Sequence, residues 1–406
     1  MRRGILAIVG LALALAPATA PATPGDLSAR LTRSLHSPQV APGMTAAIAV
    51  DARSGAVLYE QNAERAFAPA SNEKLPVSWA ALTRLGPGFR FHTEVLGVGA
   101  RVGATWDGDL FLRGHGDPTL AAADVARLAA AVRNAGITQV TGWVRGDESA
   151  YDSRRDAPGW KRSFVGSETP PLSALVVDRA RGWGPAKSPA VLAARALRAA
   201  LVARGVRVLG PSGEGRAPAS ASTLAVDRSP PLGAIVRSMN TESDNFTAEL
   251  VLKQLGTLEG SAGTTAAGGR VVLATMTAAG IPTDGVRIVD GSGLSSLDRL
   301  TPRALVGVLR AGIWDERIGP TFLASLAVTG RSGTLRKRLV NLAGVVRGKT
   351  GTTSLACSLA GLIRGDVVFA VLQHGAPVAY WPARAAQDRF VTALARATPA
   401  RATTSP

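Results

Sequence analysis

The chain has 406 residues, 46% of them hydrophobic and 5% aromatic, enough for a large core or for two to three packed units. Its formal charge is +17, carried mostly by arginine, because only six of the 46 basic residues are lysine. Such an excess attracts polyanions in general. The basic residues are nevertheless scattered, with no concentrated run and no interleaved aromatic residues, so we expect no nucleic-acid partner.

The first twenty residues have the pattern of a secretory signal peptide. Two arginines precede an apolar run over residues 5–15, and Ala18-Thr19-Ala20 supplies the small residues of a cleavage site. The run is shorter than the roughly 20 residues of a membrane-spanning helix, and no second candidate follows. We therefore expect a leader at residues 1–20, an exported protein and no further membrane span. Pro21 is unfavourable directly after a cleavage point, so a shifted cleavage site and a retained anchor both stay open.

Cysteine and histidine are rare. The single cysteine, Cys357, excludes an intrachain disulfide and is interpreted as a small buried residue. The histidines are His36, His92, His115 and His374, and no pair has the local spacing of metal ligands. The sequence therefore predicts no metal site and no cofactor, and it disfavours a Ser-His-Asp triad.

Residues 45–60 have the alternation of a β-hairpin that turns at Arg53-Ser54-Gly55. An amphipathic stretch then runs to Gly86 and predicts a helix with Ser71 near its N-terminus. Pro76 lies about one turn into this helix. Because proline lacks an amide donor and crowds the preceding turn, we expect an irregular first turn.

The pattern changes over residues 91–231. Short strand-like runs, including residues 140–145, alternate with alanine-rich helical runs at residues 121–135 and 190–204. Loops rich in proline and glycine separate them, and residues 210–218 and 229–231 resemble exit linkers. We expect an inserted, smaller α+β domain.

The C-terminal part returns to longer elements. It is helical in pattern from residue 232 to 255, and after residue 344 it has three strand-like runs followed by a helix at 382–397. Close strands with tight turns predict an antiparallel sheet, and the flanking helical runs predict a layered α+β domain. This domain comprises residues 21–90 and 232–397 and is split by the insertion, while residues 398–406 form a disordered tail.

Three short motifs occur in order along the chain. They are Ser71-Asn72-Glu73-Lys74, Ser243-Asp244-Asn245 and Lys349-Thr350-Gly351. Each alone is weak, since a chance Ser-x-x-Lys is common on exposed helix faces and Ser238-Met239-Asn240 also fits the second pattern. All three in this order, in an exported chain, are typical of class A β-lactamases and penicillin-binding proteins.

The first motif has the spacing that a serine nucleophile needs. Residues three apart share a helix face, so Ser71 Oγ and the Lys74 amine can come within hydrogen-bonding distance. A serine hydroxyl needs a base to remove its proton, and Lys74 can act so only when neutral. Burial and a second cation both lower a lysine pKa, and Lys349 is the natural second cation.

The remaining motif residues have complementary roles. The backbone amides of Ser71 and Thr352 would form an oxyanion hole. Ser243 can relay a proton to the leaving amine, and Asn245 can hold the base and bind a substrate amide. Lys349 and Thr350 can fix a terminal carboxylate. The candidate catalytic residues are therefore Ser71, Lys74, Ser243, Asn245 and Lys349, and the candidate substrate-binding residues are Thr350, Gly351 and Thr352.

Over about residues 44–390 the chain resembles the low-molecular-mass class C penicillin-binding proteins, the D-alanyl-D-alanine carboxypeptidase/endopeptidase family. The resemblance implies a penicillin-binding transpeptidase/β-lactamase-like domain with an antiparallel sheet flanked by helices. It also implies hydrolysis of peptidoglycan stem peptides through a Ser71 acyl-enzyme, covalent inhibition by β-lactams, and a place in the periplasm or the extracytoplasmic cell-wall space. Besides the three motifs, the stretches that carry it are residues 114–120, 173–179, 290–295 and 330–335.

The chain departs from the family pattern in one respect. Members usually carry two extra domains between the first two motifs, whereas here Val177-Asp178-Arg179 runs almost directly into the helical run at 190. We expect the innermost extra domain to be absent or reduced to the loop 180–189. The stretch at 290–295 is expected to be a loop near the site. Trp160 fits the substrate groove and the core equally well.

Two alternatives stay open from the residues alone. A β-lactamase would share the Ser71 acylation, but class A enzymes deacylate with a Glu-bearing loop between the second and third motifs. Glu249, Glu259 and Glu316 lie in that interval, and none is in a recognisable loop of this kind. A non-catalytic wall-binding protein on the same fold is the other alternative, which the complete set of catalytic residue types disfavours.

Overall fold

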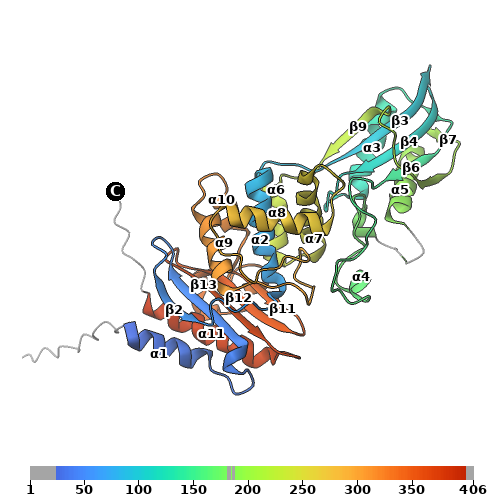
Figure 1. The fold of residues 1–406 in the computed structure, drawn as a ribbon. Coiled ribbons are helices and arrows are strands. Elements are labelled where there is room, and N and C mark those ends of the chain that lie inside the picture. Colours follow the sequence, from blue (N-terminus) through green and yellow to red (C-terminus); the bar gives the residue numbers. More distant parts are fainter. Residues whose placement is uncertain (1–23, 181–183, 185–187, 399–406) are drawn as a thin grey trace, which may run out of the picture.

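The computed structural model describes residues 24–180, 184 and 188–398, so the predicted leader and nearly all of the predicted tail lie outside the described residues. The described chain forms a body and a second region that projects away from it (Figure 1). Each has its own sheet and its own hydrophobic core.

The body is built on a six-stranded sheet in which all neighbouring strands are antiparallel. The hairpin and the three C-terminal strands that the sequence predicts pair with each other, because the first strand lies against the last. The strand order is β10 (Ala327–Val328), β11 (Val346–Thr352), β12 (Ala356–Ile363), β13 (Val367–His374), β1 (Thr45–Asp51) and β2 (Val57–Gln61).

The central strands are buried on both faces, which explains their continuous apolar sequences. Along β1, Ile48 packs in one core and Ala47 in the other, and Leu372 and Val371 of β13 divide in the same way. Helices α1 (Pro24–Leu35) and α11 (Tyr380–Ala397) pack beside each other and contribute to the second of these cores.

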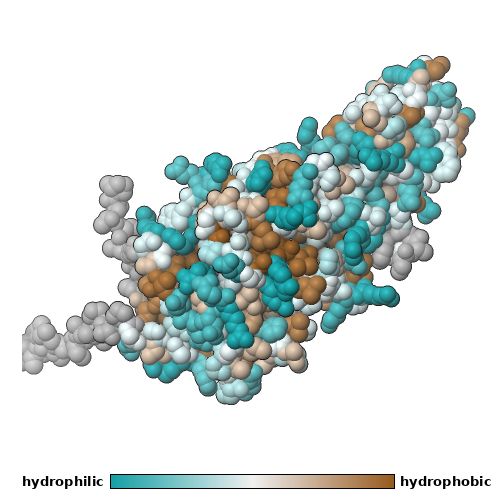
Figure 2. Space-filling view, viewed as in Figure 1, coloured by the Kyte–Doolittle hydropathy of each residue, from teal (hydrophilic) through white to brown (hydrophobic). Residues whose placement is uncertain are grey.

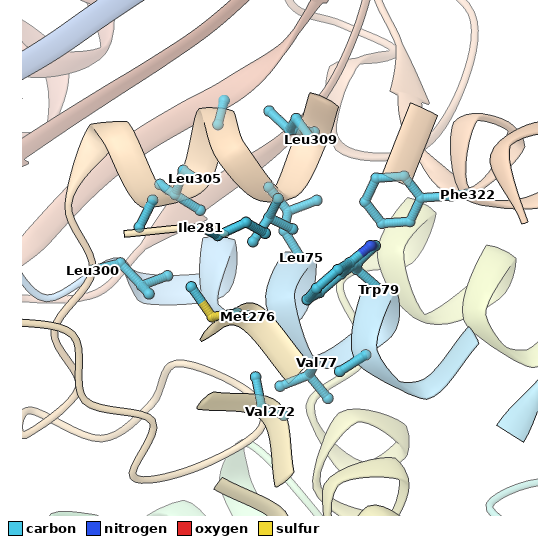
Figure 3. Packing of buried hydrophobic residues seen from close by; sticks show 14 of the residues in the cluster. Leu75, Val77, Trp79, Val272, Met276, Ile281, Leu300, Leu305, Leu309 and Phe322 are labelled. Atoms are coloured by element: carbon cyan, nitrogen blue, oxygen red, sulfur yellow. The ribbon is translucent and has the colours of Figure 1, made fainter. Parts of the chain in front are cut away.

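The other face of the sheet carries a layer of helices. Figure 3 shows α2 inside this layer, with Leu75 and Trp79 surrounded by apolar side chains of its neighbours. Residues 74–82 of α2 are buried on every side, so this helix is fixed by packing around its whole circumference. The helices are α2 (Lys74–Leu85), α6 (Leu232–Glu242), α7 (Asn245–Gly256), α8 (Thr265–Ala278), α9 (Pro302–Trp314) and α10 (Gly319–Ser325).

The projecting region has a mixed sheet in which β3 pairs with both β4 and β9, and α3 and α5 cover it. The single strand expected at residues 140–145 is two short strands, because the chain turns between them at Gly142, where a Cβ would meet the Gly108 backbone. The strands are β3 (His92–Val102), β4 (Thr105–Gly114), β5 (Gln139–Val140), β6 (Val144–Asp147), β7 (Arg207–Val208), β8 (Ser212–Glu214) and β9 (Ser222–Arg228), and the helices are α3 (Ala122–Asn134), α4 (Phe164–Ser167) and α5 (Pro189–Ala203).

The chain leaves the body along β3 and returns along β9, and these two strands pair at His92 and Arg228. From the separate cores and this shared neck we propose domain boundaries near residues 91 and 231. Short 3₁₀ helices complete the fold: η1 (Pro42–Met44), η2 (Ala70–Glu73), η3 (Asp178–Ala180), η4 (Thr257–Glu259), η5 (Gly333–Leu335) and η6 (Val340–Leu342).

The surface differs between the two regions. In Figure 2 hydrophobic residues gather over the middle of the body, whereas the visible face of the projecting region is mostly hydrophilic. Among the described helices, none is both long enough and apolar enough to cross a membrane.

Candidate active site

Ser71 lies in η2, directly before α2, and not inside the helix itself. The turn begins at Ala70, whose φ of 49° is left-handed, a conformation that non-glycine residues adopt at an energetic cost. The irregular turn expected from Pro76 is therefore this 3₁₀ turn. Pro76 itself is the third residue of α2, where the missing amide would have had no partner within the helix.

The Lys74 side chain is fully buried and joins three parts of the site. Its Nζ donates to Ser71 Oγ at 3.1 Å, to Asn245 Oδ1 at 2.8 Å and to the Ser292 carbonyl at 2.6 Å. Three acceptors match the three N–H groups of the protonated amine. The neutral amine keeps two of them and has a lone pair for the Ser71 proton.

Ser243 lies at a sharp break between two helices. The sequence predicts continuous helix to residue 255, but α6 ends at Glu242 and Ser243 takes the left-handed conformation with φ of 63°. Asp244 then caps α7 by accepting from the Thr247 amide at 3.4 Å. The break turns Ser243 towards β11 and places Asn245 beside Lys74.

The third motif runs along β11. Lys349 is fully buried, and its Nζ donates to Ser243 Oγ and to the Thr350 carbonyl, both at 2.8 Å. The Thr350 hydroxyl lies 2.9 Å from that of Thr334, a residue that sequence reasoning missed. Thr352 is exposed at the end of the strand.

Gly351 allows β11 to lie directly against the nucleophile turn. A Cβ at this position would lie 2.2 Å from Ser358 Oγ, 2.7 Å from the Pro69 carbonyl and 2.9 Å from the Ser71 amide. Ser358 in turn donates to that same carbonyl at 2.6 Å. The three motifs, far apart in sequence, therefore meet at one place between the helical layer and the sheet edge.

The two lysines have lowered pKa values, mainly because of burial. Burial lowers the pKa of Lys74 to about 8, although the carboxylates of Asp290 and Glu249 oppose this. The pKa of Lys349 is held well below its ordinary value by burial first and by the charge of Lys74 second. The cation effect expected on Lys74 thus acts on Lys349, and burial is the main cause at both residues.

Buried acids form a cluster behind Lys74 that sequence reasoning did not identify as part of the site. Glu73, Glu249, Asp290 and Asp298 are all fully buried. Burial raises the pKa of Glu249 to about 8 and raises the pKa values of Glu73 and Asp298 well above their ordinary range. Glu249 therefore holds a proton near neutral pH, which limits the negative charge beside Lys74.

Two of these acids shape the loop at residues 290–295, the stretch expected to lie near the site. Glu249 Oε1 accepts from the amides of Gly291 and Ser292 at 2.9 and 2.8 Å. Asp290 accepts from the Gly293 amide at 2.6 Å and from Trp160 Nε1 at 2.7 Å. The loop is thereby held so that the Ser292 carbonyl faces Lys74. Trp160 is half-buried against this loop.

The projecting region contributes Arg179, which follows α4 along the chain. Its guanidinium binds both carboxylate oxygens of Asp244, each at 2.7 Å, and lies 5.0 Å from the centre of the Phe246 ring. Such a two-point contact fixes orientation as well as position. It anchors the Ser243–Asn245 break from outside the body.

A cavity of about 450 Å³ opens beside the end of β11. Its lining includes Lys161, Glu168, Leu294 and Thr352. It is continuous with the exposed Thr352 and can accept part of an extended substrate next to Ser71.

Comparisons with known proteins agree with this geometry. The model of the D-Ala-D-Ala carboxypeptidase 3 (S13) family matches residues 27–183 and 183–396. The chain belongs to this family. Carboxypeptidase DacB of Mycolicibacterium smegmatis is 33% identical over 86% of this chain and 83% of its own length. The D-alanyl-D-alanine carboxypeptidase of Actinomadura sp. R39 is 30% identical over 91% of this chain and 85% of its own.

The fold is also that of a solved structure. Penicillin binding protein 4 of Haemophilus influenzae superposes with a TM-score of 0.79, covering 91% of this chain and 99% of that one at 20% identity. This confirms the predicted penicillin-binding type of fold with its antiparallel sheet. The family match is interrupted at residue 183, within the loop 180–189 where the sequence predicts a lost domain. Residues 181–183 and 185–187 of that loop lie outside the described residues.

Proposed function

We propose that this chain is a serine D-alanyl-D-alanine carboxypeptidase that cleaves peptidoglycan stem peptides through a Ser71 acyl-enzyme and is acylated by β-lactams. The observation that carries the proposal is the contact of Lys74 Nζ with Ser71 Oγ at 3.1 Å in a buried setting that lowers the lysine pKa to about 8. Family membership and the carboxypeptidase names of the relatives support the same reaction.

The first step is acylation. Neutral Lys74 takes the Ser71 proton as Oγ bonds to the carbonyl carbon of the penultimate D-Ala. The amides of Ser71 and Thr352 stabilise the oxyanion. The C–N bond then breaks, and the proton passes through Ser243 to the nitrogen of the departing D-Ala. Water repeats the sequence on the ester and restores Ser71.

Substrate recognition uses the β11 side of the site. Lys349 and Thr350 hold the terminal carboxylate of the substrate, and Asn245 binds an amide of its backbone. Gly351 lets the substrate strand lie beside Ser71, and the cavity near Thr352 receives the stem peptide. A carboxylate receptor beside the nucleophile favours cleavage of a C-terminal residue, with cross-link cleavage as a second activity of the same site.

A β-lactamase is less compatible with the observed contacts. Glu249, one of the three glutamates between the second and third motifs, is fully buried, and one of its oxygens already accepts from two backbone amides. These contacts give Glu249 a structural role in holding the loop at residues 290–295.

The export of the protein and its location in the wall space are part of this proposal. The leader pattern and the wall-acting family support them. Peptidoglycan is the corresponding partner.

The decisive experiment is mass spectrometry of muropeptides incubated with the purified protein. Loss of one terminal D-Ala from pentapeptides is expected, and splitting of cross-linked dimers would reveal the second activity. A Ser71→Ala variant should release no D-Ala and take no label from fluorescent penicillin. If that variant still took the label, Ser71 would not be the nucleophile. If wild type hydrolysed penicillin rapidly, the protein would be a β-lactamase.

A further inference from the structure

Two histidines and a glutamate gather at the neck of the projecting region, away from the motif residues. His92 and Glu94 lie two residues apart on β3, so their side chains share one face of the sheet. His115 directly follows β4, and the pairing of Thr93 with Gly114 places it opposite His92. The three side chains are thus brought together by strand register.

Their geometry is close to that of a metal-binding site. The imidazole rings of His92 and His115 are stacked with centroids 3.9 Å apart, and His115 Nε2 lies 3.3 Å from Glu94 Oε2. One ligand atom from each residue lies within 4.8 Å of the others. The side chains of His115 and Glu94 are 28% and 19% exposed, so the cluster is sheltered but reachable from solvent.

The Glu94 carboxylate is not paired with the arginine that lies opposite it. Arg113 lies across the ladder from Glu94, but its guanidinium bonds to Asp147 and to the Ala217 carbonyl. Among the described residues, the hydrogen-bond partner of Glu94 is His115.

We propose that His92, Glu94 and His115 bind a divalent transition-metal ion, with Zn²⁺ as the expected occupant. Two imidazole nitrogens and a carboxylate oxygen are a donor set that zinc accepts, with a water molecule in the fourth position. With Zn–N bonds of ~2.1 Å, the ligand atoms of a tetrahedral site lie ~3.4 Å apart. The atoms lie within 4.8 Å of one another here, so side-chain movements of up to ~1.4 Å would close the cluster.

The proposal revises the expectation of no metal site. The two histidines lack local ligand spacing in the sequence, and only the pairing of β3 with β4 brings them together. The bound ion would tie these strands at the point where the chain enters the projecting region. Its ligands are not among the residues around Ser71, so the ion would stabilise the pairing of β3 with β4 and would take no part in the proposed peptidase reaction.

The test is a zinc titration of the full chain, prepared without a histidine tag and stripped of metal. Calorimetry should give one Zn²⁺ per chain, and Co²⁺ should give the visible absorption of a four- or five-coordinate site. His92→Ala, His115→Ala and Glu94→Gln should each weaken binding at least about tenfold. His36→Ala removes an exposed histidine of the body and is the matched control, which should bind as wild type does.

Labelling by fluorescent penicillin shows that each variant is folded, and it should be unchanged in all four. The proposal fails if wild type binds no stoichiometric Zn²⁺, or if the three cluster variants bind as tightly as wild type. Loss of binding in His36→Ala alone would place the ion elsewhere and would also overturn it. None of these outcomes bears on the proposed peptidase reaction.

Discussion

The two sides of the active site are held in different ways. Lys74 begins α2, a helix that is packed on every side within the body, and the Ser71 turn directly precedes it, whereas the Ser243–Asn245 break is anchored from outside by Arg179. The side of the proposed nucleophile therefore depends on the core, and the side of the proposed proton relay depends on the projecting region. One active site can therefore combine a side that is fixed by core packing with a side whose position depends on contacts from another domain.

The largest effect is expected on the core-held side. Lys74→Ala removes the proposed base and should slow acylation by penicillin by about 10³-fold, within the range for loss of general-base catalysis. Lys253→Met is the matched control, because Lys253, on α7, is also fully buried but pairs with Asp152. Stopped-flow or gel-based labelling gives the rates. Equal losses in the two variants would contradict a specific role for Lys74.

A smaller loss is expected when the contact between β11 and the nucleophile turn is disturbed. In Gly351→Ala the new Cβ would lie 2.2 Å from Ser358 Oγ, so the strand must move away from Ser71. A displacement of this kind costs about 10²-fold in rate. Gly88→Ala has open space around its Cβ and should leave the acylation rate unchanged. A fully active Gly351→Ala protein would show that the close approach is unnecessary.

The pH dependence tests whether burial of Lys74 controls its protonation. Because the pKa of Lys74 is lowered to about 8 and only the neutral amine accepts a proton, acylation should rise with pH and be half-maximal near that value. Below it the rate should fall about tenfold for each pH unit. Acylation rates measured from about pH 6 to pH 9 check this. A rate that is constant across this range would contradict it.

The smallest effect is expected on the side held by the projecting region. Arg179→Lys replaces a two-point contact with a single one and should slow acylation by about three- to tenfold. Its effect on stability should stay below about 1 kcal/mol, because the Arg179 side chain is 46% exposed. Arg127→Ala breaks another exposed ion pair of the same region and should not change the rate. If Arg179→Lys and Arg127→Ala are acylated equally fast, the contact from the projecting region has no influence on the active site.

The main sheet and the motif residues of the active site could be predicted from the sequence, because both depend on local patterns. The strands of the main sheet alternate between two cores, and the three motifs supply the residues that meet at the site. Helix α8 was not predicted, since Gly268 and Gly269 interrupt its pattern. They are needed for packing, because a Cβ on Gly268 would lie 2.0 Å from the Leu252 carbonyl of α7.

The contacts that were not predicted from the sequence depend on the pairing of distant strands and on burial. The partnership of Arg179 with Asp244 joins residues in two regions, and that of His92 with His115 depends on the pairing of β3 with β4. The role of Glu249 is also invisible locally, because a glutamate in a helix normally faces solvent. Here it is buried and bonds to a loop more than forty residues away.

The shared neck of the projecting region has a consequence for how such proteins vary. The Phe91 amide donates to Ser229 Oγ at 3.0 Å, so the two ends of the excursion are neighbours where they join the body. Paired strands lie about 5 Å apart, a gap that a short turn can bridge. Residues 91–231 can therefore be lengthened, shortened or exchanged as one unit without changing the strand order of the main sheet. Such an exchange has to preserve the contacts that reach back to the body, among them Arg179 with Asp244, Trp160 with Asp290 and Asp152 with Lys253.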